Sequence, residues 1–412
     1  MLELCLFDLD NTLVKTDDLK EVREASKNNC DPDHLAHLNA AIRLYPQRRI
    51  YEHLFLQELR ARFPQLKLGV FTRAPRSYAK EVLEWAYPNF DWDVIVAYED
   101  VSPTKPYGNG VHKAMEALGV EYLNKVALIG DSDSDVKAAY NAGCLAAVDK
   151  RSWPSHMLPE HWKARDLIPD GIIESPQDVL DFIQDHLPFL PNLERLLEGG
   201  APQRGRRYEK VGYWAVADTR RYAISVAGRC ISNHRSVQFL REGHALSESI
   251  ERNKESTTFP QAWLETIRNF IQITFCTIFR QTEVVVTVVP HRPSRQPRLE
   301  LLLNQLAEYL AINPINRVTV TCVPNLLTYT AGVKSNHNEF LTREQRFENV
   351  RNHLVLNRPE LANAQKAYLV IDDVVTTGAS LIYSQKRLEE AGAFNVHLLG
   401  LGKNVGDLYT YT

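Results

Sequence analysis

The sequence predicts an α/β protein made of two domains. Its 412 residues exceed what a single hydrophobic core usually supports. In both halves, short apolar runs alternate with amphipathic helical patterns, which is typical of a parallel sheet covered by helices on both faces. Between the halves, residues 186–207 hold three prolines, three glycines and a run of arginines, which predicts a linker. The domains are therefore expected over 1–185 and 208–412.

The first domain is expected to be a parallel sheet that carries one long insertion. Residues 17–62 are largely helical in pattern and separate the first strand from the second. The strands are expected at 2–7, 66–72, 93–97, 125–130 and 144–149, and helices between them at 76–86, 110–118 and 135–142.

The second domain is expected to begin with a β-hairpin and to continue as a further α/β unit. The hairpin strands are expected at 208–216 and 222–228, later strands at 283–289, 317–323, 366–372 and 395–401, and helices at 260–280, 298–311 and 380–391.

Composition excludes several classes of protein. The hydrophobic fraction is 44% and the charged fraction 24%, as in soluble globular proteins, so a disordered or collagen-like chain is excluded. The net charge of −3 gives no overall basic footprint for nucleic acid. The N-terminus lacks the basic region of a signal peptide, and no apolar stretch reaches the roughly 18 residues of a membrane span. The six cysteines form no CxxC pair, which predicts free thiols in a reducing cytoplasm.

The first candidate site is assembled from four separate pieces of the first domain. Asp8 and Asp10 follow the first predicted strand, where open α/β sheets place their ligands. One carboxylate of such a pair can act as a nucleophile while the other handles a proton. Thr72 ends the second strand and offers a hydroxyl at the same edge, and Lys105 offers a cation for a phosphate.

The fourth piece predicts a metal site. Asp131 lies at the tip of the strand that ends at Gly130, and Asp135 lies one helical turn further on. A cluster of carboxylates at one sheet edge suits a hard, oxygen-preferring cation such as Mg²⁺.

In this order the four pieces resemble the haloacid dehalogenase (HAD) superfamily, over residues 1–185. The family's motifs are DxDxT, a strand-terminal Thr or Ser, a Lys and GDxxxD. The resemblance implies a Rossmann-like domain with a small helical cap at about 15–62. It also implies a Mg²⁺-dependent phosphatase that acts on small phosphorylated substrates.

The same resemblance implies a role for each residue. Asp8 would be the nucleophile that forms an aspartyl-phosphate, and Asp10 would protonate the leaving group and then activate water. Thr72 and Lys105 would hold the phosphoryl group. Asp131 would bind Mg²⁺ together with Asp8 and the backbone carbonyl of Asp10, supported by Asp135.

The second candidate site is an anion-binding loop preceded by two acids. A buried strand runs into a Thr/Gly loop and a helix, whose backbone amides can hold a phosphate. The two acids are better placed to accept hydrogen bonds from vicinal hydroxyls, so the pattern indicates a ribose 5-phosphate. The residues of this site are Asp372, Asp373, Thr376, Thr377, Gly378, Ala379 and Ser380.

This stretch resembles the PRPP-binding motif of type I phosphoribosyltransferases, and the resemblance extends over 205–412. Residues 288–311 and the segment from Arg346 to Val350 are similar to ComF-type members of that family. By this analogy, His291 and Arg292 would meet the pyrophosphate of PRPP, and 328–350 would form a hood. The cysteine-rich N-terminal module found in many ComF proteins is missing here.

The sequence therefore predicts a HAD-type hydrolase fused to a phosphoribosyltransferase domain, with PRPP as a ligand and an acceptor that no motif identifies. Two alternatives stay open for the second domain. It could sense PRPP or nucleotides in a stress or defence response without catalysis, or it could handle DNA as ComF proteins are associated with doing. Whether the chain forms a homo-oligomer also stays open.

Overall fold

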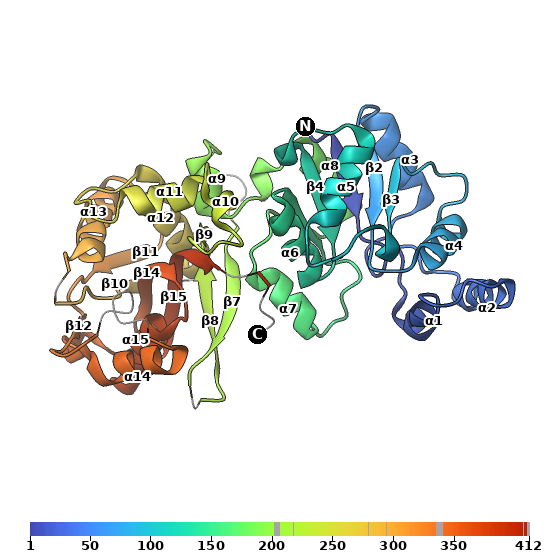
Figure 1. Cartoon of the computed structure of the whole chain (residues 1–412). Helices are drawn as coiled ribbons and strands as arrows, with labels where there is room; N and C mark the ends of the chain where they lie inside the picture. The colour runs from blue at the N-terminus through green and yellow to red at the C-terminus, as the bar shows by residue number, and fades with distance from the viewer. Residues whose placement is uncertain are drawn as a thin grey trace. The chain divides into compact units, whose positions relative to one another are not determined.

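The computed structural model describes residues 1–201, 207–216, 218–278, 280–293, 295–334, 341–406 and 408–409. The chain divides into two compact units, coloured mainly blue to green and yellow to red in Figure 1. The first unit contains Met1–Phe189, His234–Leu240 and the described residues of 406–412, and the second contains Leu190–Asn233 and Arg241–Val405.

The first unit is built on a six-stranded parallel sheet. Its central strand β1 pairs with two neighbours in register, so that Phe7 lies opposite Val70 on β2 and Ile129 on β4. The five strands expected from the sequence are confirmed, and a sixth, β6, has only three residues and shows no alternation that would predict it. In spatial order the strands are β3 (Val94–Val96), β2 (Lys67–Phe71), β1 (Leu4–Phe7), β4 (Val126–Gly130), β5 (Leu145–Asp149) and β6 (Gly171–Ile173).

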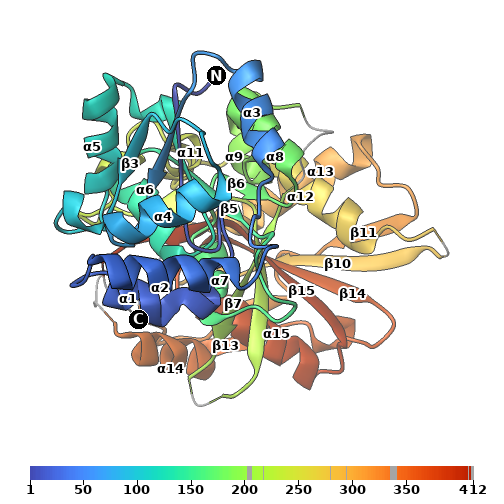
Figure 2. The ribbon, with the colours of Figure 1, turned by 90° about the vertical axis from the view of Figure 1, so that its right-hand side faces the viewer.

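Helices cover this sheet, and the insertion after β1 is helical as expected. Helices α5 and α6 pack against the sheet, and α2 packs against α4. Figure 2 shows α1 and α2 next to α4. The insertion holds α1 (Lys20–Ala25), α2 (Pro32–Arg43) and α3 (His53–Arg62), and the later helices are α4 (Arg76–Ala86), α5 (Asn109–Leu118), α6 (Asp133–Ala142), α7 (Pro159–Asp166) and α8 (Pro176–Gln184).

The second unit is built on a seven-stranded mixed sheet. The hairpin expected near 208–228 is present as the antiparallel pair β7 and β8, and the four later strands are confirmed. In spatial order the strands are β11 (Val318–Cys322), β10 (Thr282–Val288), β14 (Ala367–Val375), β15 (Asn395–Val405), β8 (Arg221–Val226) and β7 (Glu209–Trp214), with β9 (Arg229–Ile231) also paired to β15. A separate antiparallel pair consists of β12 (Leu327–Tyr329) and β13 (Leu354–Leu356).

The helices of the second half include three that the sequence predicts. The helix expected at 260–280 is shorter and ends at Phe275. The helices are α9 (Asn192–Leu197), α10 (Gln238–Arg241), α11 (Ala245–Arg252), α12 (Gln261–Phe275), α13 (Arg298–Ile312), α14 (Arg343–His353) and α15 (Ala379–Glu390). Among the helices described, none has both the length and the apolar character needed to cross a membrane.

The segment expected to be a linker, 186–207, is partly built into the second unit. Helix α9 is buried over Asn192–Arg195. Glu194 forms a buried ion pair with Arg229, whose Nη2 lies 2.5 Å from Glu194 Oε2. Composition predicts a loop here because the segment is rich in Pro, Gly and Arg, but the charge of Glu194 on α9 is neutralised by Arg229, which is distant in the sequence.

Candidate functional sites

The first candidate site lies at the carboxyl edge of the six-stranded sheet. Asp8 directly follows β1, Thr72 directly follows β2, and Asp131 directly follows β4. These three strands are neighbours in the sheet, so their ends bring the three side chains to one place. All three side chains are buried.

Lys105 joins the carboxylates of this site into one cluster. Its Nζ lies 2.5 Å from Asp8 Oδ1 and 2.7 Å from Asp135 Oδ1. The carboxylate oxygens of Asp8, Asp131 and Asp135 include a set within 4.8 Å of one another. The structure thus brings together four residues from three segments that lie far apart in the sequence.

The cluster holds three carboxyl groups and one ammonium group. Burial raises the pKa of Asp8 to about 7, although Lys105 acts in the opposite direction. Burial, with Asp135 and Asp8 nearby, also raises the pKa of Asp131 well above its usual value. Burial opposes ionisation of Asp135 as well, but Lys105 and Ser132 hold its pKa below the usual value. Three oxygen-donor side chains against one ammonium are a set that fits a divalent cation such as Mg²⁺.

Asp135 is held in place on both of its oxygens. Oδ1 is bonded to Lys105, and Oδ2 accepts hydrogen bonds from the Ser132 hydroxyl at 2.6 Å and the Ser132 backbone N–H at 3.1 Å. Gly130 leaves the space for this carboxyl, because a Cβ at Gly130 would lie 2.3 Å from Asp135 Cγ. Glycine is therefore required at the end of β4 for packing, not for its backbone angles.

The side chain of Asp10 contacts other residues than those that surround Asp8. Its Oδ1 accepts hydrogen bonds from Thr16 Oγ1 at 2.6 Å and from the Tyr78 hydroxyl at 3.0 Å. Its Oδ2 lies 3.0 Å from Arg23 Nη1. The carboxylate of Asp10 is not part of the group formed by Asp8, Asp131 and Asp135. The expected contact of its backbone carbonyl with a metal stays a prediction.

Two further contacts bear on the site. Thr72 Oγ1 accepts a hydrogen bond from the backbone N–H of Ala74 at 3.0 Å, so its own hydroxyl proton can be donated elsewhere. Trp153 Nε1 donates to the backbone carbonyl of Asp131 at 2.9 Å. Sequence reasoning missed Trp153, Arg23 and Tyr78, because no motif distinguishes them from ordinary packing residues.

Residues 43–148 match the family model of haloacid dehalogenase-like hydrolases. This part of the chain is a HAD-type domain. The chain is 26% identical over 214 residues to the pyrophosphatase PpaX of Halalkalibacterium halodurans, which covers 43% of this chain and 95% of that protein. It is 27% identical over 121 residues to the phosphoglycolate phosphatase of Aquifex aeolicus, covering 29% of this chain and 53% of that one. The chain thus spans about half the length of some of these relatives.

Two solved structures also align with part of this chain. A predicted phosphoglycolate phosphatase from Haemophilus somnus has 18% sequence identity and a TM-score of 0.32, with 44% of this chain and 97% of that chain covered. A putative β-phosphoglucomutase from Thermotoga maritima has 20% identity and a TM-score of 0.32, with 45% and 99% covered.

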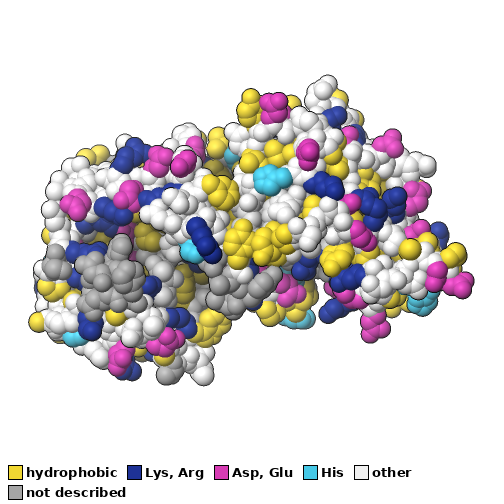
Figure 3. Space-filling view, viewed as in Figure 1, with side chains coloured by type: hydrophobic (Ala, Val, Ile, Leu, Met, Phe, Trp, Pro, Cys, Tyr) yellow, Lys and Arg dark blue, Asp and Glu magenta, His cyan; other side chains and the backbone are white. Residues whose placement is uncertain are grey.

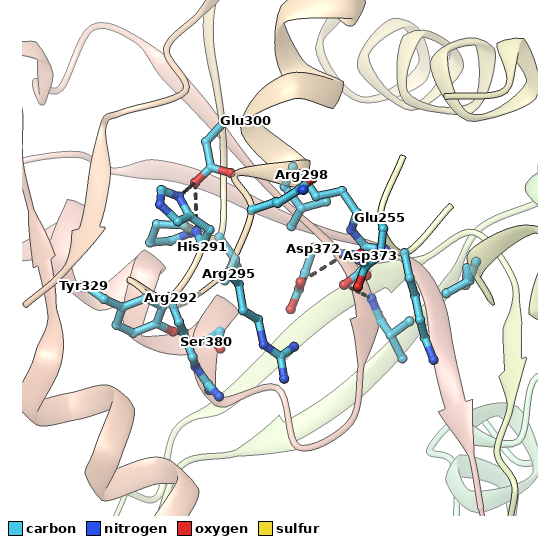
Figure 4. A pocket seen from close by; sticks show the side chains of 17 residues that line it. Glu255, His291, Arg292, Arg295, Arg298, Glu300, Tyr329, Asp372, Asp373 and Ser380 are labelled. Carbon is cyan, nitrogen blue, oxygen red and sulfur yellow. Dashed lines mark hydrogen bonds and ion pairs between the residues drawn. The ribbon is translucent and has the colours of Figure 1, made fainter. Parts of the chain in front are cut away.

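The second candidate site is a pocket of about 800 Å³ in the second unit. Figure 4 shows the side chains that line it, among them a concentration of cations opposite two acids. Of the residues expected at this site, Asp372, Asp373, Ser380, His291 and Arg292 line the pocket. Arg295 and Arg298 also line the pocket, and both belong to the basic stretch 291–298 that the sequence assigns to pyrophosphate. Tyr329, from the expected hood, and Lys254, which no motif singles out, complete the polar lining named here.

The two acids lie near the end of β14 and are fixed by short local contacts. Asp372 Oδ1 accepts from the backbone N–H of Asp373 at 3.0 Å, and Asp373 Oδ1 accepts from that of Val374 at 2.8 Å. Arg298, the first residue of α13, forms an ion pair with Asp373. Burial raises the pKa of Asp372 to about 7, although Arg298 and Arg292 act in the opposite direction.

The loop between β14 and α15 has the geometry that its glycine permits. Gly378 has a φ of 76° and precedes the first turn of α15. A Cβ there would also lie 2.9 Å from Ile224 Cδ1, so a larger residue is excluded both by backbone strain and by packing. Thr376 and Thr377 lie between β14 and Gly378, and Ala379 begins α15. The pocket lining does not include these three residues or Gly378, whereas Ser380 lines the pocket and its Oγ lies 3.3 Å from the Tyr329 hydroxyl.

The two residues expected to bind pyrophosphate, His291 and Arg292, are held by different contacts. His291 is tied to Glu300 Oε1, which lies 2.8 Å both from its ring Nδ1 and from its backbone N–H. Arg292 lies over the ring of Tyr329, 5.9 Å from its centroid. Of the hood expected at 328–350, residues 335–340 lie outside the described residues.

Proposed function

We propose that the HAD-type domain hydrolyses phosphate esters or anhydrides with Mg²⁺, through an aspartyl-phosphate on Asp8. The observation that carries this proposal is the position of Asp8 at the sheet edge, where it pairs with the Lys105 ammonium and lies within 4.8 Å of carboxylate oxygens of Asp131 and Asp135. The phosphatases among the relatives support the same class of reaction.

Each residue of the site has a separate role in this reaction. An Asp8 oxygen attacks phosphorus while the bond to the leaving oxygen breaks, and Asp10 supplies the proton that this oxygen takes. Lys105 and the Thr72 hydroxyl hold the phosphoryl oxygens, and the second step uses Asp10 to activate water. Asp8, Asp131 and the backbone carbonyl of Asp10 would hold Mg²⁺, which supplies charge neutralisation of the transferring phosphoryl group.

Phosphate release tests this proposal. The purified protein should release phosphate from small phosphate compounds with Mg²⁺ and lose that activity with a chelator. Asp8→Asn should abolish release, whereas Asp133→Asn should not, because Asp133 begins α6, two residues after Asp131, but pairs with Lys137. Full activity in Asp8→Asn would contradict the proposal.

For the second unit, we propose that the pocket binds PRPP and supports transfer of its phosphoribosyl group. The observation that carries this is that Asp372, Asp373 and Ser380 line one pocket together with the arginines Arg292, Arg295 and Arg298. The acids would accept from the ribose hydroxyls, the Thr376–Ser380 loop would take the 5-phosphate, and Arg292 and Arg295 would take the pyrophosphate. The bond from ribose C1 to pyrophosphate breaks as the bond to the acceptor forms.

Calorimetric titration with PRPP and Mg²⁺ tests the second proposal. Asp373→Asn should weaken binding by about 10-fold or more, since a charge-assisted hydrogen bond is lost. Glu283→Gln is a suitable control, because Glu283 is exposed at the start of β10. Binding without pyrophosphate release, over a broad set of acceptors, would favour the sensor alternative. Salt-dependent binding of single-stranded DNA in place of PRPP would favour the DNA-handling alternative.

A further inference from the structure

The insertion of the HAD-type domain places a cation beside the proposed proton donor. Arg23 lies on α1, and its Nη1 is 3.0 Å from Asp10 Oδ2. The Arg23 side chain is 25% exposed, so a ligand can reach its guanidinium. Asp10 is only two residues after Asp8, and Arg23 interacts electrostatically with both carboxylates.

The position of Arg23 is set by the way Asp10 is held. Thr16 and Tyr78 donate to one oxygen of Asp10, which leaves the second oxygen to Arg23. Thr16 precedes α1 within the insertion, and Tyr78 is a buried residue of α4. A carboxylate fixed on one edge by two hydroxyls holds its partner cation in a defined place.

Arg23 keeps hydrogen-bond donors for a ligand. A guanidinium has five N–H donors, and among the described residues the contact of Arg23 is the one to Asp10. Arg48, on the same insertion, is different: it is buried, and all three of its nitrogens are bonded. Its partners are Asp18 and the backbone carbonyls of Lys15, Ala41 and Ile42.

We propose that Arg23 binds an anionic group on the leaving-group side of the substrate and is a specificity-determining residue of the phosphatase site. The inference rests on the proposed function, because Asp10 marks the leaving-group side by acting as the proton donor. The preferred substrates are phosphate compounds whose leaving group carries its own negative charge. Inorganic pyrophosphate and the phosphate ester of a hydroxy acid both have this chemistry.

Steady-state kinetics on three substrates test the inference in the full-length protein. Pyrophosphate and 2-phosphoglycolate have anionic leaving groups, and glycerol 2-phosphate has a neutral one. Arg23→Gln should raise KM about 10- to 100-fold for the two anionic substrates, which is the usual effect of losing a charge-assisted hydrogen bond. The KM for glycerol 2-phosphate should change by less than about 3-fold, and Arg23→Lys should restore part of the preference.

Lys20→Gln is the matched control, because Lys20 is an exposed cation at the start of the same helix. It should leave all three KM values unchanged. Equal losses on the three substrates in Arg23→Gln, mainly in kcat, would show that Arg23 only positions Asp10 and would overturn the inference. A wild-type protein that hydrolyses none of the substrates would refute the phosphatase proposal itself, and the inference with it.

Discussion

Replacing Lys105 by methionine should destabilise the first unit and do so in a pH-dependent way. The Lys105 side chain is 1% exposed and lies between Asp8 and Asp135. Removing one partner of a buried ion pair leaves an uncompensated charge and typically costs about 3–5 kcal/mol of unfolding free energy. In a unit of this size, that loss corresponds to a fall in Tm of roughly 6–20 °C.

The pH dependence follows from the direction of the pKa shifts. Burial already raises the pKa of Asp8 to about 7 and that of Asp131 as well, and Lys105 opposes both shifts. Without Lys105 these pKa values rise further, so the folded state binds more protons than the unfolded state, whose carboxyls titrate near about pH 4. The stability of the variant should therefore fall as the pH rises from about 4 through 7, and the deficit should be larger at pH 8 than at pH 5.

Thermal unfolding in a chelator, followed by circular dichroism, is the assay for Lys105→Met. Lys125→Met is the matched control, because Lys125 lies at the same 2.5 Å from Glu3 but both side chains are more than 40% exposed. Lys125→Met should unfold like the wild type, since exposed ion pairs contribute little. Mg²⁺ should restore part of the stability of Lys105→Met. Equal Tm values for the two variants, or a deficit that is the same at pH 5 and pH 8, would refute the reasoning.

Two other substitutions have defined consequences. Gly130→Ala places a Cβ against Asp135, so it should lower the free energy of unfolding by about 1–3 kcal/mol and weaken both Mg²⁺ binding and turnover. An unchanged affinity for Mg²⁺ in titration calorimetry would contradict this. Glu194→Gln breaks the buried pair with Arg229 and should lower the stability of the second unit by about 3–5 kcal/mol at neutral pH. Although burial opposes it, Arg229 holds the pKa of Glu194 well below its usual range. The stability that the ion pair contributes is therefore present above the unfolded-state pKa of about 4.3 and is lost as the pH falls below that value. In denaturant titrations the unfolding free energies of variant and wild type should converge in acid. A difference that stays constant with pH would argue against the ion pair.

The parts of the first site that the sequence predicts are those that depend on strand ends. Asp8, Thr72 and Asp131 each follow a buried apolar strand, and parallel strands bring their carboxyl ends to one edge whatever the loops do. Arg23 and Trp153 reach the site only through the packing of the insertion and of the segment before α7. No local pattern records such contacts, because they depend on residues distant in the sequence.

The same distinction applies to the second unit. The strand, glycine and acids at 372–380 form a local pattern that indicates a phosphate site. The pairing of Arg298 with Asp373 joins the start of α13 to the end of β14, and only the fold brings these together. Strands of three residues, such as β9, β12 and β13, are too short to show an alternating pattern.

A ³¹P NMR time course of the full-length protein with Mg²⁺, PRPP, pooled nucleobases and pooled phosphate compounds tests the central claim of two separate active sites most directly. The account predicts that phosphate release from the pooled phosphate compounds requires Asp8 but not Asp373, and that pyrophosphate release from PRPP requires Asp373. Because the first site would hydrolyse pyrophosphate, free pyrophosphate should accumulate most in Asp8→Asn. Asp8→Asn and Asp373→Asn, run beside the wild type, separate the two reactions. If neither product forms in the wild type, or if both survive in both variants, the assignment of the two sites is contradicted.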